Sequence, residues 1–273
     1  MSLLERTKSL LRNYRSSPKK AFGQNFIIEP SVYDRMIDSA SLTKSDTVLD
    51  IGAGLGFLTR LMAEKSKQVI AVEADPQLAC ILREQLSQFS NVQVVQGDVF
   101  EVNIPEFNKI VSTPPYSISS RLLLWILNRR FDCAVLVLQK EFANRLAVSV
   151  GGEDYGWLSI LTYCSVNVDL LDAIPKSMFF PSPKVDSIIT RLVPKIAPFD
   201  LEMNGTDFKR LVQMLFTQRN KKVRNAVLPY LRGVRGMSKE DAIAIAERLP
   251  FLVKRVRELA PEDFGVLANA LVE

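Results

Sequence analysis

Two short segments of this sequence carry residues whose types and spacing could bind and react. In the first, TVLDIGAGLGFLT over 47–59, Asp50 is followed by Gly52, Gly54 and Gly56 at every second position. Glycines let the backbone approach a ligand closely and form turns that a side chain would obstruct. An apolar strand, a glycine turn and a helix in this order are typical of a nucleotide site in a doubly wound sheet. We expect a nucleotide-like ligand here; a purely structural turn is the alternative.

The glycine spacing indicates which ligand this turn accepts. A dinucleotide fingerprint requires G-x-G-x-x-G, whereas Phe57 occupies the third glycine position and Gly56 comes one residue early, which disfavours a nicotinamide enzyme. The spacing seen here is instead associated with S-adenosylmethionine (AdoMet) enzymes. In these enzymes no pyrophosphate is bound, and an acid can face the cationic ligand.

Acids also end the next two predicted strands. Glu73 ends a strand predicted over 68–75, about 20 residues beyond the first glycine, where doubly wound folds place a carboxylate for ribose hydroxyls. Asp98 follows Gly97 at the end of a strand predicted over 91–99, and it could accept a hydrogen bond from an exocyclic amine such as adenine N6. A solvent-exposed acid at a strand end is the alternative for Glu73.

The second segment is Thr113-Pro114-Pro115-Tyr116, which follows a fourth predicted strand. Prolines fix the backbone, so the Pro114 carbonyl can be held toward an incoming group, and Tyr116 offers a flat face for a base. The exocyclic amine of adenine is a poor nucleophile, but acceptors around it can favour attack of its lone pair on a sulfonium methyl. Positioning and electrostatics would supply most of the acceleration. A structural turn is again the alternative.

The elements that must position these segments alternate regularly. Strands are predicted within 47–59, 68–75, 91–99, 108–120 and 132–142, with helical patterns between them and a closing strand over 184–192. Such alternation gives a parallel sheet with helices on both faces. We therefore predict an α/β fold with a Rossmann-like class I AdoMet methyltransferase domain and a small C-terminal helical domain. The predicted divisions are a basic arm or short helix over 1–20, the methyltransferase domain over 21–195, a linker over 196–206 and the helical domain over 207–273.

The composition excludes several kinds of chemistry. The chain contains no histidine, so Ser-His-Asp, Cys-His and His-metal mechanisms are excluded. Its three cysteines, at positions 80, 133 and 164, show no C-x-x-C spacing, which disfavours a disulfide scaffold and a zinc site. The sequence has no apolar run of membrane-spanning length and no secretory signal at its start. We expect a soluble cytoplasmic protein without a bound metal.

Lysines and arginines gather in two runs of a chain whose formal net charge is +5. The first run lies within 1–20, where Glu5 is the only acid, and the second lies within 219–235, which has no acid. A single run would be interpreted as a solvated face. Two runs at opposite ends of the chain favour a polyanionic partner.

Several segments in a fixed order also carry a resemblance to a known family. They are Lys20–Phe26, the glycine turn, Glu73, Gly97-Asp98, Pro115–Ser119, Phe179–Ser187, Phe216–Lys222 and Arg257–Phe264. On these segments nearly the whole chain resembles the small-subunit ribosomal RNA adenine N6,N6-dimethyltransferases of the kasugamycin-resistance type. These enzymes are relatives of the ribosomal RNA methylases that confer macrolide resistance.

The resemblance implies a cofactor site for AdoMet. Asn25 and Ile27 would contact AdoMet from a segment that covers it. Gly52 and Gly54 of the glycine turn would contact its methionine end, and Glu73 would accept from its ribose hydroxyls. Asp98 would accept from its adenine amine, and Thr113 would contact it from the loop after the fourth predicted strand.

The resemblance also implies a substrate site. Tyr116 and Phe179 would sandwich a flipped target adenine, while Thr113 and Pro114 orient its amine. In the helical domain, Arg219, Lys221, Lys222 and Arg224 would bind ribosomal RNA through its shape and phosphates. The implied reaction is dimethylation at N6 of two adjacent adenosines in the 3′-terminal hairpin of small-subunit rRNA. It would be carried out during ribosome biogenesis on a pre-30S-type particle. We expect a monomer, because the proposed RNA-binding faces need exposure.

One departure from the family pattern leaves alternatives open. The family has Asn and then Leu or Ile before Pro-Tyr, where this chain has Thr113 and Pro114. A threonine hydroxyl can accept one hydrogen bond, but it is shorter than an asparagine amide. Either the enzyme works, or transfer is impaired and the protein acts mainly as an RNA-binding factor in ribosome assembly. A methylase of another RNA and a DNA amino-methyltransferase are further alternatives.

Overall fold

The structure is a computed structural model that describes residues 1–147 and 150–272. The chain divides into two compact units, which are described separately. The first consists of Met1–Ala143 and Val168–Pro194, and the second of Asn144–Asn167 and the chain from Lys195 onward. Among the described residues, no helix combines the length and apolar character needed to span a membrane.

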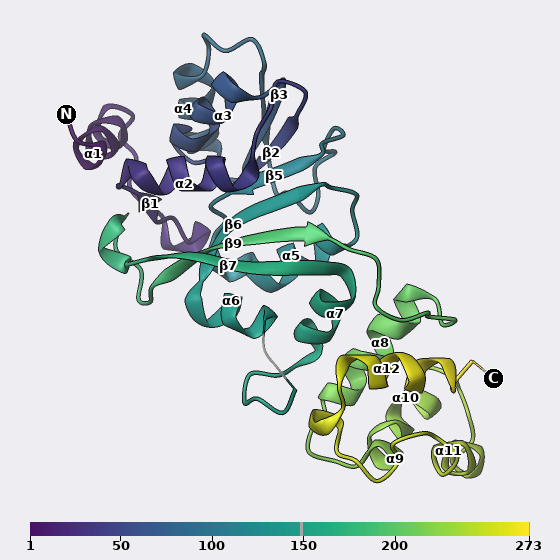
Figure 1. Cartoon of the computed structure of the whole chain (residues 1–273). Coiled ribbons are helices and arrows are strands. Elements are labelled where there is room, and N and C mark those ends of the chain that lie inside the picture. Colours follow the sequence, from purple (N-terminus) through teal and green to yellow (C-terminus); the bar gives the residue numbers. More distant parts are fainter. Residues whose placement is uncertain (148–149, 273) are drawn as a thin grey trace. The chain divides into compact units, whose positions relative to one another are not determined.

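The first unit is built on a mostly parallel sheet. Within the described residues the sheet has seven strands in the order β4-β3-β2-β5-β6-β9-β7 (Figure 1). Their bounds are β2 Thr47–Ile51, β3 Gln68–Glu73, β4 Val92–Gln96, β5 Lys109–Ser112, β6 Cys133–Gln139, β7 Val166–Ile174 and β9 Ser187–Pro194. Strands β2 to β6 pair in parallel, and β9 pairs antiparallel with β6. The order reverses direction between β2 and β5, where open α/β sheets bind their ligands.

Helices cover both faces of this sheet, as Figure 1 shows. They are α2 Pro30–Ala40, α3 Phe57–Lys65, α4 Pro76–Gln85, α5 Ser119–Leu127 and α6 Lys140–Leu146. The central strands are buried on both faces, which explains their nearly continuous apolar sequences. The predicted α/β, Rossmann-like fold is therefore confirmed.

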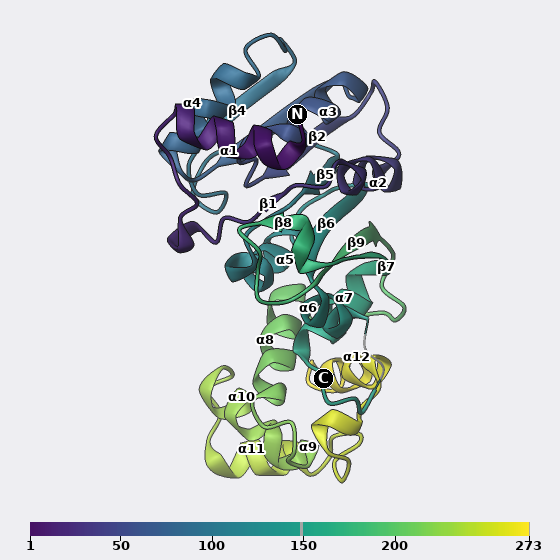
Figure 2. The ribbon, with the colours of Figure 1, turned by 90° about the vertical axis from the view of Figure 1, so that its left-hand side faces the viewer.

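A separate two-stranded ribbon joins two distant parts of the chain. Strand β1 (Phe26–Ile27) pairs antiparallel with β8 (Phe179–Phe180), so that Ile27 lies opposite Phe179 (Figure 2). Three short 3₁₀ turns flank these segments and the loop after β5: η1 Lys20–Phe22, η2 Tyr116–Ile118 and η3 Lys176–Met178.

The predicted basic arm over 1–20 is largely a packed helix. Helix α1 (Leu3–Asn13) begins with a capping box in which Ser2 and Glu5 bond each other's backbone amides. Leu10 and Leu11 are buried in a cluster with Leu55, Leu78 and Ile81. Leu10 and Leu11 form an apolar stripe on the otherwise basic α1, and this stripe packs against α4 (Figure 2).

The second unit is helical. It contains α7 Trp157–Ser165, α8 Gly205–Phe216, α9 Val223–Ala226, α10 Leu228–Gly233, α11 Lys239–Ala246, η4 Val256–Glu258 and α12 Pro261–Asn269. Phe216 stacks on Phe264 at 5.5 Å between ring centroids, and Tyr155 meets Phe216 edge-on at 5.7 Å. Tyr155 Oη also donates to the Leu259 carbonyl at 2.7 Å. These contacts tie residues 144–167 to the helical unit, whereas the sequence prediction placed them in the larger domain.

Candidate active site

One pocket of the first unit collects most of the residues that the sequence analysis singled out. It lies at the carboxyl ends of β2, β3 and β5, beside the β1–β8 ribbon. The predicted residues in its lining are Asn25, Ile27, Gly52, Gly54, Glu73, Thr113, Pro114, Tyr116 and Phe179. Residues from five segments, separated by up to about 150 positions, therefore meet in one place.

The glycine turn forms the floor of this pocket. Gly52 has φ +75° and Gly54 has φ +59°, values that side chains rarely adopt. A Cβ atom on Gly52 would lie 3.2 Å from the Pro115 Cδ, which is tighter than ordinary van der Waals contact. The close approach of the two loops therefore requires glycine at position 52.

Glu73 presents a buried carboxylate to the pocket. Its Oε2 accepts a hydrogen bond from the Gly54 amide and its Oε1 accepts one from the Asp75 amide, both at 2.8 Å. Burial raises the pKa of Glu73, and these amides partly offset that effect. Because a carboxylate has about four lone-pair sites, these two bonds leave acceptor capacity for a ligand with paired hydroxyls.

Asp50 lines the pocket beneath the glycine turn. Its carboxylate is buried and accepts a hydrogen bond from Thr59 Oγ1 at 2.7 Å. Burial raises the pKa of Asp50 to about 7, with a further contribution from the charge of Glu73. A ligand cation bound in the pocket would favour the ionised form of both acids.

Asp75 is a pocket-supporting residue that the sequence analysis missed. Its two oxygens accept hydrogen bonds from Lys19 Nζ and Gln24 Nε2, each at 2.9 Å. It also caps α4 by accepting from the Gln77 amide at 3.0 Å. The Asp-Pro pair is a recognisable capping signal at a helix start. The long-range partners of Asp75, Lys19 and Gln24, cannot be recognised from the sequence. Through them Asp75 holds the segment that carries Asn25 over the pocket.

Two aromatic side chains line the pocket, Tyr116 from the loop after β5 and Phe179 from β8. Tyr116 is half-buried and Phe179 is buried. Tyr116 Oη lies 2.5 Å from Ser187 Oγ, and burial raises the pKa of Tyr116. Pro115 packs against the backbone of Gly23 and Gly52, which fixes the position of the loop.

Asp98 is not part of the pocket lining. It follows β4, one strand beyond Glu73, and accepts a hydrogen bond from the Phe100 amide at 3.0 Å. Arg121 faces it, with Nη1 3.8 Å from the Asp98 carboxylate, and lies over the Phe100 ring at 3.8 Å. The predicted role of Asp98 toward adenine therefore stays a prediction.

The predicted RNA-binding residues all lie in the second unit. Lys221, Lys222 and Arg224 are exposed. Arg219 is half-buried and donates to the carbonyls of Gly152 and Glu153, so it also has a structural task.

A second basic segment in this unit is not among the RNA-binding residues predicted from the sequence. The Val223 amide donates to the Lys254 carbonyl at 2.9 Å, and the Val256 amide donates to the Lys221 carbonyl at 3.1 Å. These bonds bring exposed cations beside the predicted ones; they are Lys254, Arg255 and Arg257. Backbone pairing over this separation leaves no local sequence signal.

The described residues contain no group of three or more His, Cys, Asp or Glu side chains arranged to hold a metal ion. The polar groups of the pocket are instead carboxylates, side-chain amides, backbone groups and hydroxyls. Such a set suits a ligand with hydroxyls and a positive charge, and the positive-φ glycines leave room for it.

Comparisons with known proteins agree with this geometry. Residues 15–251 match the family model described as ribosomal RNA adenine dimethylase. A protein of Methanosarcina acetivorans named "Probable ribosomal RNA small subunit methyltransferase A" is 38% identical over 97% of this chain and 98% of its own length. A protein of the same name from Thermococcus sibiricus is 38% identical over 93% of this chain and 92% of its own length.

Two solved structures are similar over nearly the whole chain. A dimethyladenosine transferase from Plasmodium falciparum has a TM-score of 0.74 and 28% identity, covering 89% of this chain and 95% of that one. The 23S rRNA methyltransferase ErmE has a TM-score of 0.64 and 28% identity, covering 91% of this chain and 100% of that one.

Proposed function

This chain belongs to the ribosomal RNA adenine dimethylase family, and from that premise we propose that it transfers methyl groups from AdoMet to N6 of adenosines in small-subunit rRNA. The family resemblance inferred from the sequence is thereby confirmed. The observation that carries the proposal is the single pocket in which the glycine turn, Glu73 and the aromatic pair meet.

The residues of the pocket fit AdoMet. AdoMet supplies a methyl group on a positively charged sulfur, which is transferred without a metal. Glu73 would accept from the ribose hydroxyls, and Gly52 and Gly54 would leave space for the methionine end. Asn25 and Ile27 would close the pocket from the segment that Asp75 holds. The assignment of adenine recognition to Asp98 is part of the same proposal.

The target adenine would stack between Tyr116 and Phe179 after leaving its own base stack. The Thr113 hydroxyl and the Pro114 carbonyl would accept from its amine and direct the lone pair toward the methyl group. The proton released after transfer needs no strong base in the site, because the methylated ammonium is itself acidic. The buried carboxylates act on the cofactor side, where a positive charge is to be bound.

RNA binding would rest on the basic surface of the second unit. Lys221, Lys222 and Arg224, together with Lys254, Arg255 and Arg257, would contact phosphates. Arg219 would contribute mainly by holding the loop that contains Gly152 and Glu153.

The finer parts of the proposal concern the substrate and the setting. We infer two adjacent adenosines in the 3′-terminal hairpin, each methylated twice, as the target. We further infer a cytoplasmic monomer that acts on a pre-30S-type particle. The curated relatives carry the name of a small-subunit enzyme, which supports this target over large-subunit RNA.

The experiment uses the purified full chain, labelled AdoMet and small ribosomal subunits from a strain that lacks this modification. Label should enter the RNA, and mass spectrometry of the 3′ fragment should locate four methyl groups on two adenosines. In parallel reactions with large-subunit RNA and with duplex DNA, label that enters one of these and not the small subunits would redirect the assignment. Cofactor binding without any incorporation would leave the assembly role suggested by Thr113.

A further inference from the structure

One hydrogen bond joins the two loops that supply the aromatic walls of the pocket. It links Tyr116 Oη and Ser187 Oγ at 2.5 Å. Tyr116 lies in η2, which follows the Thr113–Pro115 loop. Ser187 is fully buried at the start of β9, where its backbone lies opposite Gln139 of β6. The bond therefore anchors the end of a loop side chain in the interior of the sheet.

Ser187 directly follows the segment that connects β8, which carries Phe179, to β9. The Asp186 carboxylate accepts from the Lys176 amide at 2.9 Å, and the Asp186 carbonyl accepts from the Lys140 amide at 3.0 Å. Ser182 Oγ donates to the Lys176 carbonyl at 2.8 Å. The bonds of Lys176 with Asp186 and Ser182 close the segment between η3 and β9 on itself, and the bond from Lys140 joins this segment to α6. A side chain bonded to Ser187 is consequently fixed relative to Phe179.

We propose that Ser187 is a positioning residue for methyl transfer, whose hydroxyl holds the Tyr116 ring in the orientation that faces Phe179 across the base site. The inference rests on the proposed function, because it takes the space between the two rings as the place of the target adenine. A tyrosine ring pivots about χ1 and χ2, and a bond at Oη, its far end, restrains both rotations at once. Phenylalanine at position 116 would supply the same stacking face without this restraint.

The environment of the bond makes it strong enough for this task. Ser187 is fully buried and Tyr116 is half-buried, so water competes poorly for either hydroxyl. Burial also raises the pKa of Tyr116, which keeps the phenol protonated and able to donate. Removing either hydroxyl already breaks the hydrogen bond, so removing the second one causes no further loss of restraint on the ring. The effects of the two substitutions on kcat should therefore not be additive.

The test is a double-mutant cycle with Tyr116→Phe, Ser187→Ala and their combination, assayed on small subunits that lack the modification. We expect each single variant to lower kcat about tenfold, and the double variant to lower it about tenfold as well. AdoMet affinity and KM for the particle should change less than about twofold, because other residues bind the cofactor and the phosphates. Ser187→Thr keeps the hydroxyl and should restore most of the rate.

Thr190→Val is the matched control. Thr190 lies on the same strand as Ser187 and is fully buried, but its hydroxyl has no hydrogen-bond partner among the described residues. Its removal should leave kcat unchanged. A tenfold loss in this variant would show that any buried hydroxyl of β9 matters, and it would overturn a specific role for Ser187.

A second measurement does not depend on catalysis. With ring-labelled tyrosine, ¹³C NMR of the AdoMet-bound protein should show a shifted and exchange-broadened Tyr116 signal in Ser187→Ala, and an unchanged signal in Thr190→Val. An unchanged Tyr116 signal in Ser187→Ala, or single losses that multiply to about 100-fold in the double variant, would overturn the inference. If the wild-type protein methylates no RNA, the proposed function fails, while the NMR comparison still decides whether Ser187 orients the ring.

Discussion

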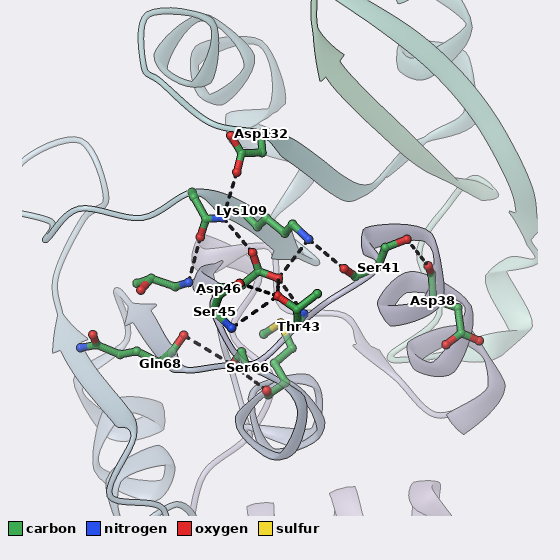
Figure 3. Close-up of polar contacts among 12 residues, drawn as sticks. Asp38, Ser41, Thr43, Ser45, Asp46, Ser66, Gln68, Lys109 and Asp132 are labelled. Atoms are coloured by element: carbon green, nitrogen blue, oxygen red, sulfur yellow. Dashed lines mark hydrogen bonds and ion pairs between the residues drawn. The ribbon is translucent and has the colours of Figure 1, made fainter.

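The two ends of the same parallel strands are built in opposite ways. At the amino ends of β2, β5 and β6, polar side chains satisfy one another (Figure 3). The Asp46 carboxylate accepts from Lys109 Nζ at 3.0 Å, from the Thr43 amide at 2.6 Å, from the Thr43 hydroxyl at 3.0 Å and from Asn108 Nδ2 at 2.8 Å. At the carboxyl ends, Glu73 accepts two backbone amides and otherwise faces the pocket.

The electrostatics of the two ends follow from this difference. Burial raises the pKa of Asp46, but its bonds from Asn108, Thr43 and Lys109 outweigh burial and lower it to about 2. Burial dominates at the other end, where it raises the pKa of Asp50 to about 7. At the amino end the acid makes its hydrogen bonds and ion pair within the protein and stabilises the fold, whereas at the carboxyl end the acids keep acceptor sites for a ligand.

Tyr116→Ala should have the largest effect on the carboxyl end. Without the ring, the target base loses one stacking wall and its amine is no longer held in line, so kcat should fall by about 100-fold or more. Initial rates on unmodified small subunits measure this. Phe89→Ala is the control: Phe89 is a half-buried aromatic near the amino end of β4, and its removal should lower the melting temperature with little effect on kcat. Equal losses of kcat in Tyr116→Ala and Phe89→Ala would contradict a specific role of the carboxyl end in catalysis.

Glu73→Gln should separate binding from stability. A neutral amide makes a weaker hydrogen bond to the ribose hydroxyls and does not attract a cation, so the Kd for AdoMet should rise about 30-fold. The melting temperature without AdoMet should change little, because the removal of a buried charge is offset by the loss of one of the two bonds from backbone amides, since glutamine has a single acceptor oxygen. Calorimetric titration and thermal unfolding give both values. A lower melting temperature with unchanged Kd would make Glu73 a structural residue.

Much of the carboxyl end could be predicted from the sequence, because its residues stand in short motifs at strand ends. The glycine turn, Glu73 and the Thr113–Tyr116 loop belong to this class. Asp75 and Ser187 could not be found in this way, since their roles depend on partners far away in the sequence. The same reason explains why residues 144–167, which group with the helical unit, were predicted to belong to the larger domain, and why the packing of α1 against α4 could not be predicted.

Lys109→Met tests the amino end. Lys109 donates to Asp46 and to the Ser41 carbonyl, and both members of the ion pair are largely buried. Removing Lys109 leaves a buried carboxylate without a counter-charge, so the free energy of unfolding should fall by about 3 kcal/mol with kcat unchanged at low temperature. Lys65→Met is the matched control, because the Lys65–Asp38 pair is exposed and should contribute less than about 1 kcal/mol. Urea unfolding distinguishes the two, and equal losses would contradict the comparison.

The pH dependence of stability should have opposite signs at the two ends. Asp46 has a lowered pKa, so its contribution is present above about 4 and is lost as pH falls toward 2. Asp50 has a raised pKa, so its contribution is present below about 4 and is lost as pH rises through 7. Urea midpoints from pH 3 to 8 should show a smaller acid limb in Asp46→Asn and a smaller neutral decline in Asp50→Asn. Part of that decline should persist, since the pKa of Glu73 is also raised. An unaltered decline in Asp50→Asn would place the titrating group elsewhere.

Thr113→Asn should give the smallest change in kcat. It tests the residue at the carboxyl end that departs from the family pattern, which has Asn at this position. An asparagine amide oxygen reaches further than a threonine hydroxyl, so the amine of the target base should be held at least as well, and kcat should be equal or about twofold higher. Thr113→Val keeps the shape and removes the acceptor, so it should lower kcat about tenfold if the hydroxyl orients the amine. A rate that falls in Thr113→Asn but persists in Thr113→Val would mean that the loop is shaped around a small side chain, with the Pro114 carbonyl alone directing the attack.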